Sequence, residues 1–129
     1  MTPELTALVL AALWQTVHFA LYSVLAQKQV GSKYAASSRD TPRQLTGTAG
    51  RAQRAMQNSF EGLILFAIAT LVITFADKGN ARTTLACLVY LLARGLYLPA
   101  YLFDWVPWRS VIWLVGFLAT NLLFVMALF

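Results

Sequence analysis

The chain has 129 residues, 59% of them hydrophobic and only 12% charged, with a mean hydropathy of +0.63 and a net charge of +5. Soluble domains are usually about 45–50% apolar and about 25% charged, so this composition excludes a water-soluble globular domain and indicates one all-α, multi-pass membrane domain over residues 1–129. Most basic residues fall in one connecting loop, so the positive charge reflects membrane topology rather than nucleic-acid binding.

The first predicted membrane helix covers residues 5–26, an almost wholly apolar stretch long enough for one crossing. Thr2, Pro3 and Glu4 predict its start, because they supply a capping hydroxyl, a proline at the first helical position and an acid in the first turn. The run is too long for a typical secretory signal and has no basic segment before it, so we interpret it as a retained helix. The single histidine, His18, is expected to hydrogen-bond to a neighbouring helix rather than to catalyse. With this histidine and one cysteine, no metal-ligand cluster is available.

A long polar connection follows, over residues 28–50. From Lys28 to Arg54 one acid, Asp40, accompanies six basic residues, which are Lys28, Lys33, Arg39, Arg43, Arg51 and Arg54. Cytoplasmic loops carry such an excess, so we place this loop inside and, with four crossings, both termini on the non-cytoplasmic side. The connection is longer than an ordinary structureless loop, so it is either mobile or covers another part of the protein.

The second predicted helix, residues 52–75, begins with a polar stripe. On a helix of about 100° per residue, the stripe falls within roughly 80° of arc. Its members are Arg51, Arg54, Asn58 and Glu61. Unpaired charge in hydrocarbon is costly, so a stripe that leads directly into an apolar run must face protein or water, and it indicates a functional site.

The third predicted helix, residues 83–103, carries a second polar row on one face, at spacings of 4, 3 and 4. The row consists of Tyr90, Arg94, Tyr97 and Tyr101. An arginine inside a membrane helix needs a partner, and Glu61 is the obvious candidate. Pro99 lies within this helix and should free the carbonyl of Gly95.

The fourth predicted helix covers residues 108–129, and Pro107 is well placed to open it. Trp105 and Trp108 stand where an interfacial aromatic belt is expected. Arg109 lies near the same cytoplasmic surface as the start of the second helix. Cationic, carboxylate, amide and phenol groups therefore converge at one membrane depth. Such a pocket suits a small, mostly anionic ligand that also carries an amine, and its cations and hydroxyls could stabilise a thiolate.

Three motifs, one on each of the last three predicted helices, together resemble the membrane-associated proteins in eicosanoid and glutathione metabolism, the MAPEG family. The resemblance rests on Arg51-x-x-Arg54-x-x-x-Asn58-x-x-Glu61, on Tyr90-x-x-x-Arg94-x-x-Tyr97-x-x-x-Tyr101 and on Pro107-x-Arg109-Ser110. It covers nearly the whole chain, including its size, its four helices and its long first loop. The sequence departs from some members at Met56, Gln57, Gly62 and Trp113.

The resemblance implies an integral membrane four-helix bundle that assembles as a homotrimer and binds glutathione as a co-substrate between subunits, near the cytoplasmic surface. The implied binding residues are Arg51, Arg54, Asn58, Glu61, Arg94, Tyr97 and Tyr101. Within this set Glu61 would hold the γ-glutamyl amine or orient Arg94. Arg109 would stabilise the glutathione thiolate, and Ser110 is the alternative thiol donor. The implied activity is that of a transferase or peroxidase, which adds the thiolate to a lipophilic electrophile or uses it to reduce a lipid hydroperoxide.

Two other functions stay open at this point. A small multidrug exporter needs a membrane carboxylate that exchanges a proton for a cationic drug, and Glu61 is the deep candidate; neighbouring arginines, however, should keep it ionised and repel cations. A non-catalytic membrane partner would keep the same fold without the reaction, because fold does not fix function.

Overall fold

Four long helices and one short helix make up the protein. The structure, a computed structural model, describes all of residues 1–129. The helices are α1 (Pro3–Val30), α2 (Ser32–Ala35), α3 (Gly47–Phe75), α4 (Ala81–Leu102) and α5 (Trp108–Leu128). All except α2 are long and apolar enough to cross a membrane. The absence of any strand and the presence of four such helices confirm the predicted all-α four-helix fold.

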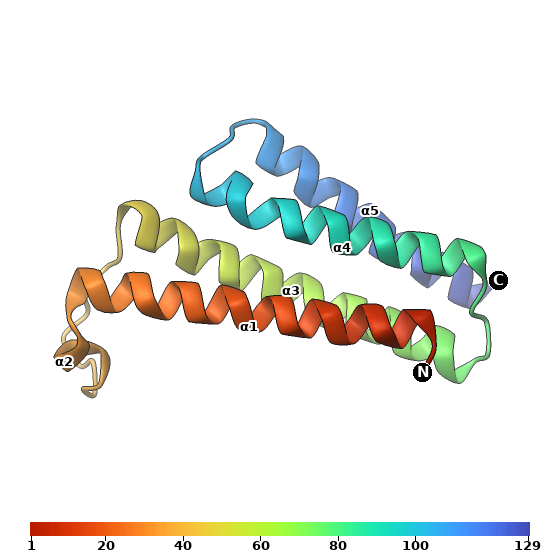
Figure 1. Cartoon of the computed structure of the whole chain (residues 1–129), viewed down its shortest axis with the longest axis horizontal. Coiled ribbons are helices and arrows are strands. Elements are labelled where there is room, and N and C mark those ends of the chain that lie inside the picture. The colour runs from red at the N-terminus through yellow and green to blue at the C-terminus, as the bar shows by residue number, and fades with distance from the viewer.

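The bundle is built from two pairs of helices (Figure 1). Helix α1 runs beside α3, and α4 runs beside α5. Both chain termini lie at one end of the bundle, whereas α2 and the loop between α4 and α5 lie at the other end. The N-terminal end of α3 and the C-terminal end of α4, which carry the predicted polar motifs, therefore meet at the end opposite the termini.

The connection between α1 and α3 is more ordered than a bare loop. Helix α1 continues to Val30, past its expected end near Ala26, because no helix-breaking residue occurs before Gly31. Gly31 adopts a φ of 88°, which favours glycine, and its amide donates to the carbonyl of Gln27 at 2.8 Å. The short α2 follows at once. The polar stretch then leads into α3 at Gly47, before the start expected near residue 52.

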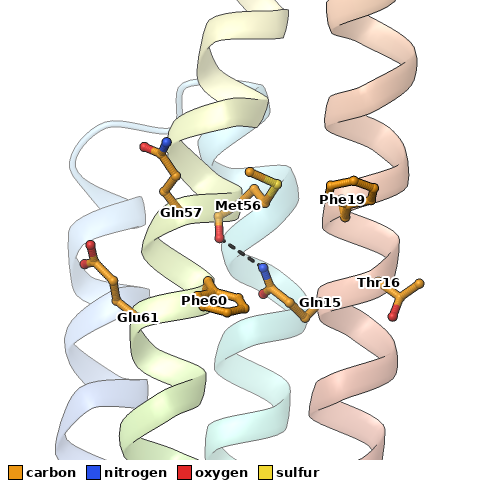
Figure 2. A pocket seen from close by; sticks show the side chains of 7 residues that line it. All are labelled: Gln15, Thr16, Phe19, Met56, Gln57, Phe60 and Glu61. Atoms are coloured by element: carbon orange, nitrogen blue, oxygen red, sulfur yellow. Dashed lines mark hydrogen bonds between the residues drawn. The ribbon is translucent and has the colours of Figure 1, made fainter. Parts of the chain in front are cut away.

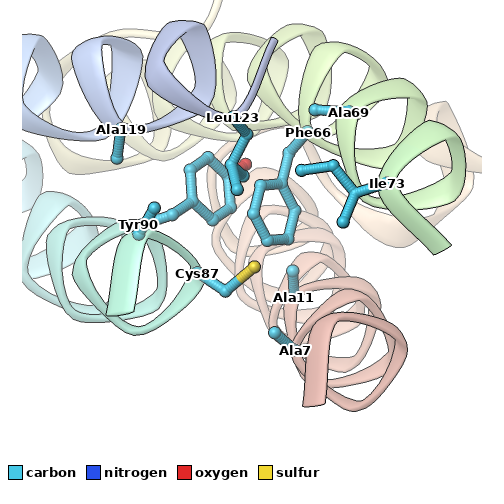
Figure 3. Close-up of a cluster of buried hydrophobic side chains, with 10 residues drawn as sticks. Ala7, Ala11, Phe66, Ala69, Ile73, Cys87, Tyr90, Ala119 and Leu123 are labelled. Atoms are coloured by element: carbon cyan, nitrogen blue, oxygen red, sulfur yellow. The ribbon is translucent and has the colours of Figure 1, made fainter. Parts of the chain in front are cut away.

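The main core lies in the half of the bundle near the termini (Figure 3). Phe66 of α3 and Tyr90 of α4 stack there with ring centroids 3.8 Å apart and an interplanar angle of 5°. Small residues from the four long helices surround this pair and include Ala7, Ala11, Ala69, Ala86 and Ala119. In a membrane, helices associate through close packing rather than hydrophobic burial, and small residues allow that approach. The buried Cys87 sits in the same cluster as one more small side chain.

A buried carboxylate fastens α1 to the start of α4. Glu4 is 2% exposed, and its Oε1 accepts hydrogen bonds from the hydroxyls of Thr83 at 2.5 Å and Thr84 at 3.3 Å. A negative charge is also favoured at a helix N-terminus, which here is capped by Asn80. Glu4 is therefore a buried carboxylate that the sequence interpretation had treated only as an acid in the first turn of the helix.

Replacing Glu4 with alanine is expected to destabilise the bundle by about 2 kcal/mol, because hydrogen bonds to charged groups contribute about 1.5–3 kcal/mol. Thermal unfolding of the purified protein measures this loss. The control is Asn121→Ala, which removes a half-buried side-chain amide that bonds only to its own helix, at the carbonyl of Phe117. Equal unfolding temperatures for the two variants would show that Glu4 does not join the helices.

Candidate functional site

A row of three tyrosines and one arginine runs along α4 toward the end of the bundle opposite the termini. We call it the arginine–tyrosine row, and it consists of Tyr90, Arg94, Tyr97 and Tyr101. The guanidinium of Arg94 lies 5.4 Å from the ring centroid of Tyr90 and 5.5 Å from that of Tyr97. The rings of Tyr97 and Tyr101 meet edge to face at 5.5 Å. The shared face that helical spacing predicts is thus a continuous set of contacts.

Two arginines from other helices meet this row at Tyr101. Arg54 of α3 donates from Nε to the Tyr101 hydroxyl at 3.2 Å. Arg109 of α5 places its guanidinium 4.9 Å from the centroid of the Tyr101 ring and 3.7 Å from the carboxylate of Asp104. Tyr101 therefore connects three helices and is flanked by two cations. Asn58, also on α3, lies beside the Tyr97 hydroxyl.

The expected ion pair between Arg94 and Glu61 is absent, and that expectation was wrong for the single subunit. The only ion pair in the structure joins Arg109 and Asp104. Arg94 is 5% exposed, and its Nε and Nη1 atoms are buried without a hydrogen-bond partner. The Glu61 side chain is exposed on the outside of α3. Helical spacing placed the two residues at a common depth but did not show that Glu61 leans outward.

The four residues of the predicted polar stripe on α3 face different parts of the structure. Arg51 turns to the end of α4, where its Nε donates to the carbonyl of Leu102 at 3.0 Å and its Nη2 lies 3.4 Å from the Thr48 hydroxyl. Arg54 and Asn58 face the arginine–tyrosine row, as described above. Glu61 faces outward. The structure thus brings Arg54, Asn58 and Arg109 to the row.

Glu61 lines a wide groove along α1 and α3 (Figure 2). The groove has a volume of about 670 Å³, and its walls are Gln15, Thr16, Phe19, Met56, Gln57, Phe60 and Glu61. The amide of Gln15 donates to the backbone carbonyl of Met56 at 3.1 Å and ties the two helices together beneath it. The groove lining is mostly apolar, and the exposed Gln57 and Glu61 add polar groups to it.

Helix α1 contributes a half-buried tryptophan and a buried histidine that the sequence motifs did not include. The Trp14 indole donates to the backbone carbonyl of Arg94 at 3.0 Å, next to the carbonyl of Gly95 that Pro99 was expected to free. His18 is 1% exposed, and its ring packs edge-on against the Trp14 ring with the ring centroids 5.8 Å apart. Neither ring nitrogen of His18 has a hydrogen-bond partner. The expected hydrogen bond from His18 to another helix is therefore absent. The sequence motifs pointed to this part of α4 but not to its contact with Trp14.

Ser110 lies at the edge of this arrangement. Its side chain is exposed and makes no hydrogen bond, although it follows Arg109 directly in the first turn of α5. Arg109 is half-buried, with 34% of its side chain exposed. Of the two proposed thiol-stabilising residues, Arg109 lies against the arginine–tyrosine row, with its guanidinium over the Tyr101 ring.

The site could hold an anion chemically, because three guanidinium groups reach one set of phenol rings and one carboxamide. Comparison with known proteins gives one match: residues 5–129 fit the model of a family described as the MAPEG family. No curated protein and no solved structure matches the chain.

Proposed function

The chain belongs to the MAPEG family, and from that premise we propose that it binds glutathione and uses the glutathione thiolate on lipophilic molecules. Membership, together with four apolar helices, makes it an integral multi-pass membrane protein with a general role in glutathione or eicosanoid metabolism. The specific activity proposed is that of a glutathione transferase or peroxidase. The observation that carries the proposal is the meeting of Arg54 and Arg109 at Tyr101.

In the proposed complex, Arg54 and Asn58 bind the carboxylates and peptide groups of glutathione. Tyr97 and Tyr101 line the site, and Arg51 adds positive charge beside it. Arginine is suited to this role because its planar fork can hold a carboxylate by two parallel hydrogen bonds.

The proposed chemical step depends on the thiolate. A nearby cation and hydroxyl donors favour the charged form of a thiol and lower its pKa. Arg109 supplies the cation in this proposal, and Ser110 is a further donor beside it. In the transferase reaction, the thiolate sulfur bonds to an electrophilic alkene carbon, the electron pair of the double bond moves to the neighbouring carbon, and that carbon takes up a proton. In the peroxidase reaction, the sulfur bonds to the terminal oxygen of the hydroperoxide, the O–O bond breaks, and the lipid leaves as an alcohol after protonation. A second glutathione then converts the resulting sulfenic acid to glutathione disulfide and water. Both substrates reach the site from the bilayer.

We also propose that the protein is a homotrimer whose subunits meet along the groove of Figure 2. Gln57 and Glu61 are exposed there on a helix that is long and apolar enough to cross a membrane. Lipid cannot pair with a carboxylate, whereas a neighbouring subunit or a ligand amine can. The arginine-rich connection between α1 and α3 would face the cytoplasm, and both termini would lie on the opposite side.

The proposed function is tested by mixing glutathione with the purified, detergent-solubilised protein and following the ultraviolet absorbance of the thiolate. We expect a saturable thiolate signal near neutral pH and a rise in unfolding temperature, because a ligand that binds only the folded state stabilises it. The absence of both signals would refute glutathione binding and favour the non-catalytic partner.

A phenylalanine at Tyr101 is expected to weaken glutathione binding by about tenfold or less, since one hydrogen bond contributes about 1 kcal/mol. The change removes the hydroxyl that accepts the hydrogen bond from Arg54, and it keeps the aromatic ring that lies against the Arg109 guanidinium. Calorimetric titration measures the affinity. Tyr34→Phe is the matched control, because its hydroxyl bonds only within the connection, to Thr41 and Arg43. An affinity equal to wild type in Tyr101→Phe would remove this hydroxyl from the site.

A multidrug exporter is the second candidate, and one observation favours it. Glu61 has no ion pair and lines the groove together with the aromatic residues Phe19 and Phe60, which suits an organic cation. Proton-coupled uptake of cationic dyes into vesicles separates the two functions. Uptake that depends on Glu61, tested with Glu61→Gln, would support export, and the proposed enzyme is expected to show none.

A further inference from the structure

The guanidinium of Arg94 lies directly against the backbone of α3 at Gly62. A β-carbon placed on Gly62 would overlap Nη2 of Arg94 and would lie only 2.9 Å from its Cζ atom. Real β-carbons do not tolerate such a contact, so any other residue at this position would displace the guanidinium. The position of the Arg94 head group thus depends on the missing side chain of Gly62.

The opposite wall of this space is Gly116 of α5. A β-carbon there would lie 3.7 Å from Nε of Arg94 and 3.5 Å from the Ala93 β-carbon, which are ordinary contacts. The guanidinium therefore passes between α3 and α5 through a slot that is tight at Gly62 and looser at Gly116. Gly95, on the same helix as Arg94, faces open space, with nothing within 4 Å of an added β-carbon.

Within the slot the cation lacks a counter-charge. Nε and Nη1 of Arg94 are buried and unpaired, and no carboxylate of the chain forms an ion pair with it. A buried charge without a partner is strongly destabilising, particularly at membrane depth. An anionic group from outside the subunit would remove this cost, and a carboxylate matches the fork of a guanidinium best.

We propose that Gly62 is a specificity-determining position that holds Arg94 where its guanidinium binds one of the two carboxylates of glutathione. This inference rests on the proposed function and refines it: of the two carboxylates of glutathione, Arg94 binds one and Arg54 binds the other. Gly62 acts through Arg94 and is a positioning residue. Displacing the guanidinium costs little in folding terms, because it is the end of a flexible side chain next to a cavity of about 240 Å³.

The test uses glutathione and two analogues that each lack one carboxylate: the amide of the glycyl carboxylate and γ-aminobutyryl-cysteinyl-glycine. Their affinities for the full-length protein in detergent are measured by calorimetric titration. The wild type should prefer glutathione to each analogue by about tenfold or more, as expected for a charge-assisted hydrogen bond. Gly62→Ala should bind glutathione and one of the two analogues with about equal affinity, because the carboxylate that this analogue lacks is no longer bound. Its preference for glutathione over the other analogue should persist.

A double-mutant cycle shows whether Gly62 acts through Arg94. Arg94→Met should lose the preference for glutathione over the same analogue as Gly62→Ala does. The double variant Gly62→Ala/Arg94→Met should have the same affinities as Arg94→Met alone. Gly116→Ala should have a smaller effect than Gly62→Ala, and Gly95→Ala should keep both preferences.

Several results would overturn the inference. If Gly62→Ala discriminates against both analogues as the wild type does, Gly62 does not set specificity. If Gly62→Ala does not fold, Arg94→Met alone decides, because full discrimination in that variant removes Arg94 from carboxylate binding. Further loss in the double variant would show that Gly62 acts in another way. A wild type that does not bind glutathione would instead refute the proposed function, and the inference with it.

Discussion

Replacing Arg109 with alanine is expected to reduce the second-order rate constant for glutathione-dependent turnover by about 10²-fold, the effect seen when one preorganised charge-stabilising donor is lost. The same change should raise the pKa of the bound glutathione thiol by about two pH units, because about 1.4 kcal/mol corresponds to one unit. The direction follows from charge: the guanidinium favours the thiolate, so without it the thiol form persists to higher pH.

The structure supports Arg109 over Ser110 for this role. Arg109 is half-buried at the start of α5 and lies over the ring of Tyr101, which also accepts from Arg54. Its partner Asp104 is 3.7 Å away and more exposed, so solvent weakens this ion pair and leaves the guanidinium available to a ligand. The Ser110 side chain is exposed and makes no hydrogen bond.

A pH titration of the thiolate absorbance measures the effect. Arg109→Lys keeps the positive charge but loses the planar guanidinium with its paired donors. The pKa of the bound glutathione thiol in this variant should therefore lie between the values for wild type and Arg109→Ala. Arg82→Ala is the matched control, since it removes one exposed arginine at the far end of α4. An unchanged titration midpoint in Arg109→Ala, with glutathione still bound, would transfer thiolate stabilisation to another group.

The sequence predicted the fold because the evidence for it is local. Each membrane crossing appears as an apolar run of sufficient length, and the polar stretches between the runs define the connections. The arginine–tyrosine row was also predictable, because spacings of 4, 3 and 4 place residues on one face of any α-helix. The contacts of Arg94 with Tyr90 and Tyr97 agree with that arithmetic.

The side-chain contacts between helices were not predictable, because they depend on the distances and orientations of the helices. Sequence periodicity carries no information on these. Spacing put Glu61 and Arg94 at one depth, but the glutamate leans outward and the arginine extends past Gly62. The burial of Glu4 likewise depends on where the start of α4 meets the start of α1. A glycine in an apolar helix gives no signal of its own until the neighbouring side chain is located.

Phe66→Ala is expected to have the largest effect on stability. Phe66 is 0% exposed and stacks on Tyr90, which is 1% exposed. Truncating a buried phenylalanine costs about 3–5 kcal/mol in soluble proteins, as lost transfer energy plus a cavity. Lipid is as apolar as the protein core, so in a membrane the contribution from transfer is small and the loss comes mainly from packing contacts. We therefore expect Phe66→Ala to lower the free energy of unfolding by about 3 kcal/mol.

This loss should also reach the site, because Tyr90 supports Arg94 on its other side. An unsupported Tyr90 ring would tilt into the space left by Phe66 and release the guanidinium from its slot, so glutathione affinity should fall together with the unfolding temperature. Phe75→Ala is the matched control on the same helix, since Phe75 is 86% exposed. If both variants unfold alike, the Phe66–Tyr90 stack does not hold the bundle together. If Phe66→Ala is unstable but binds glutathione as the wild type does, the core and Arg94 are energetically independent.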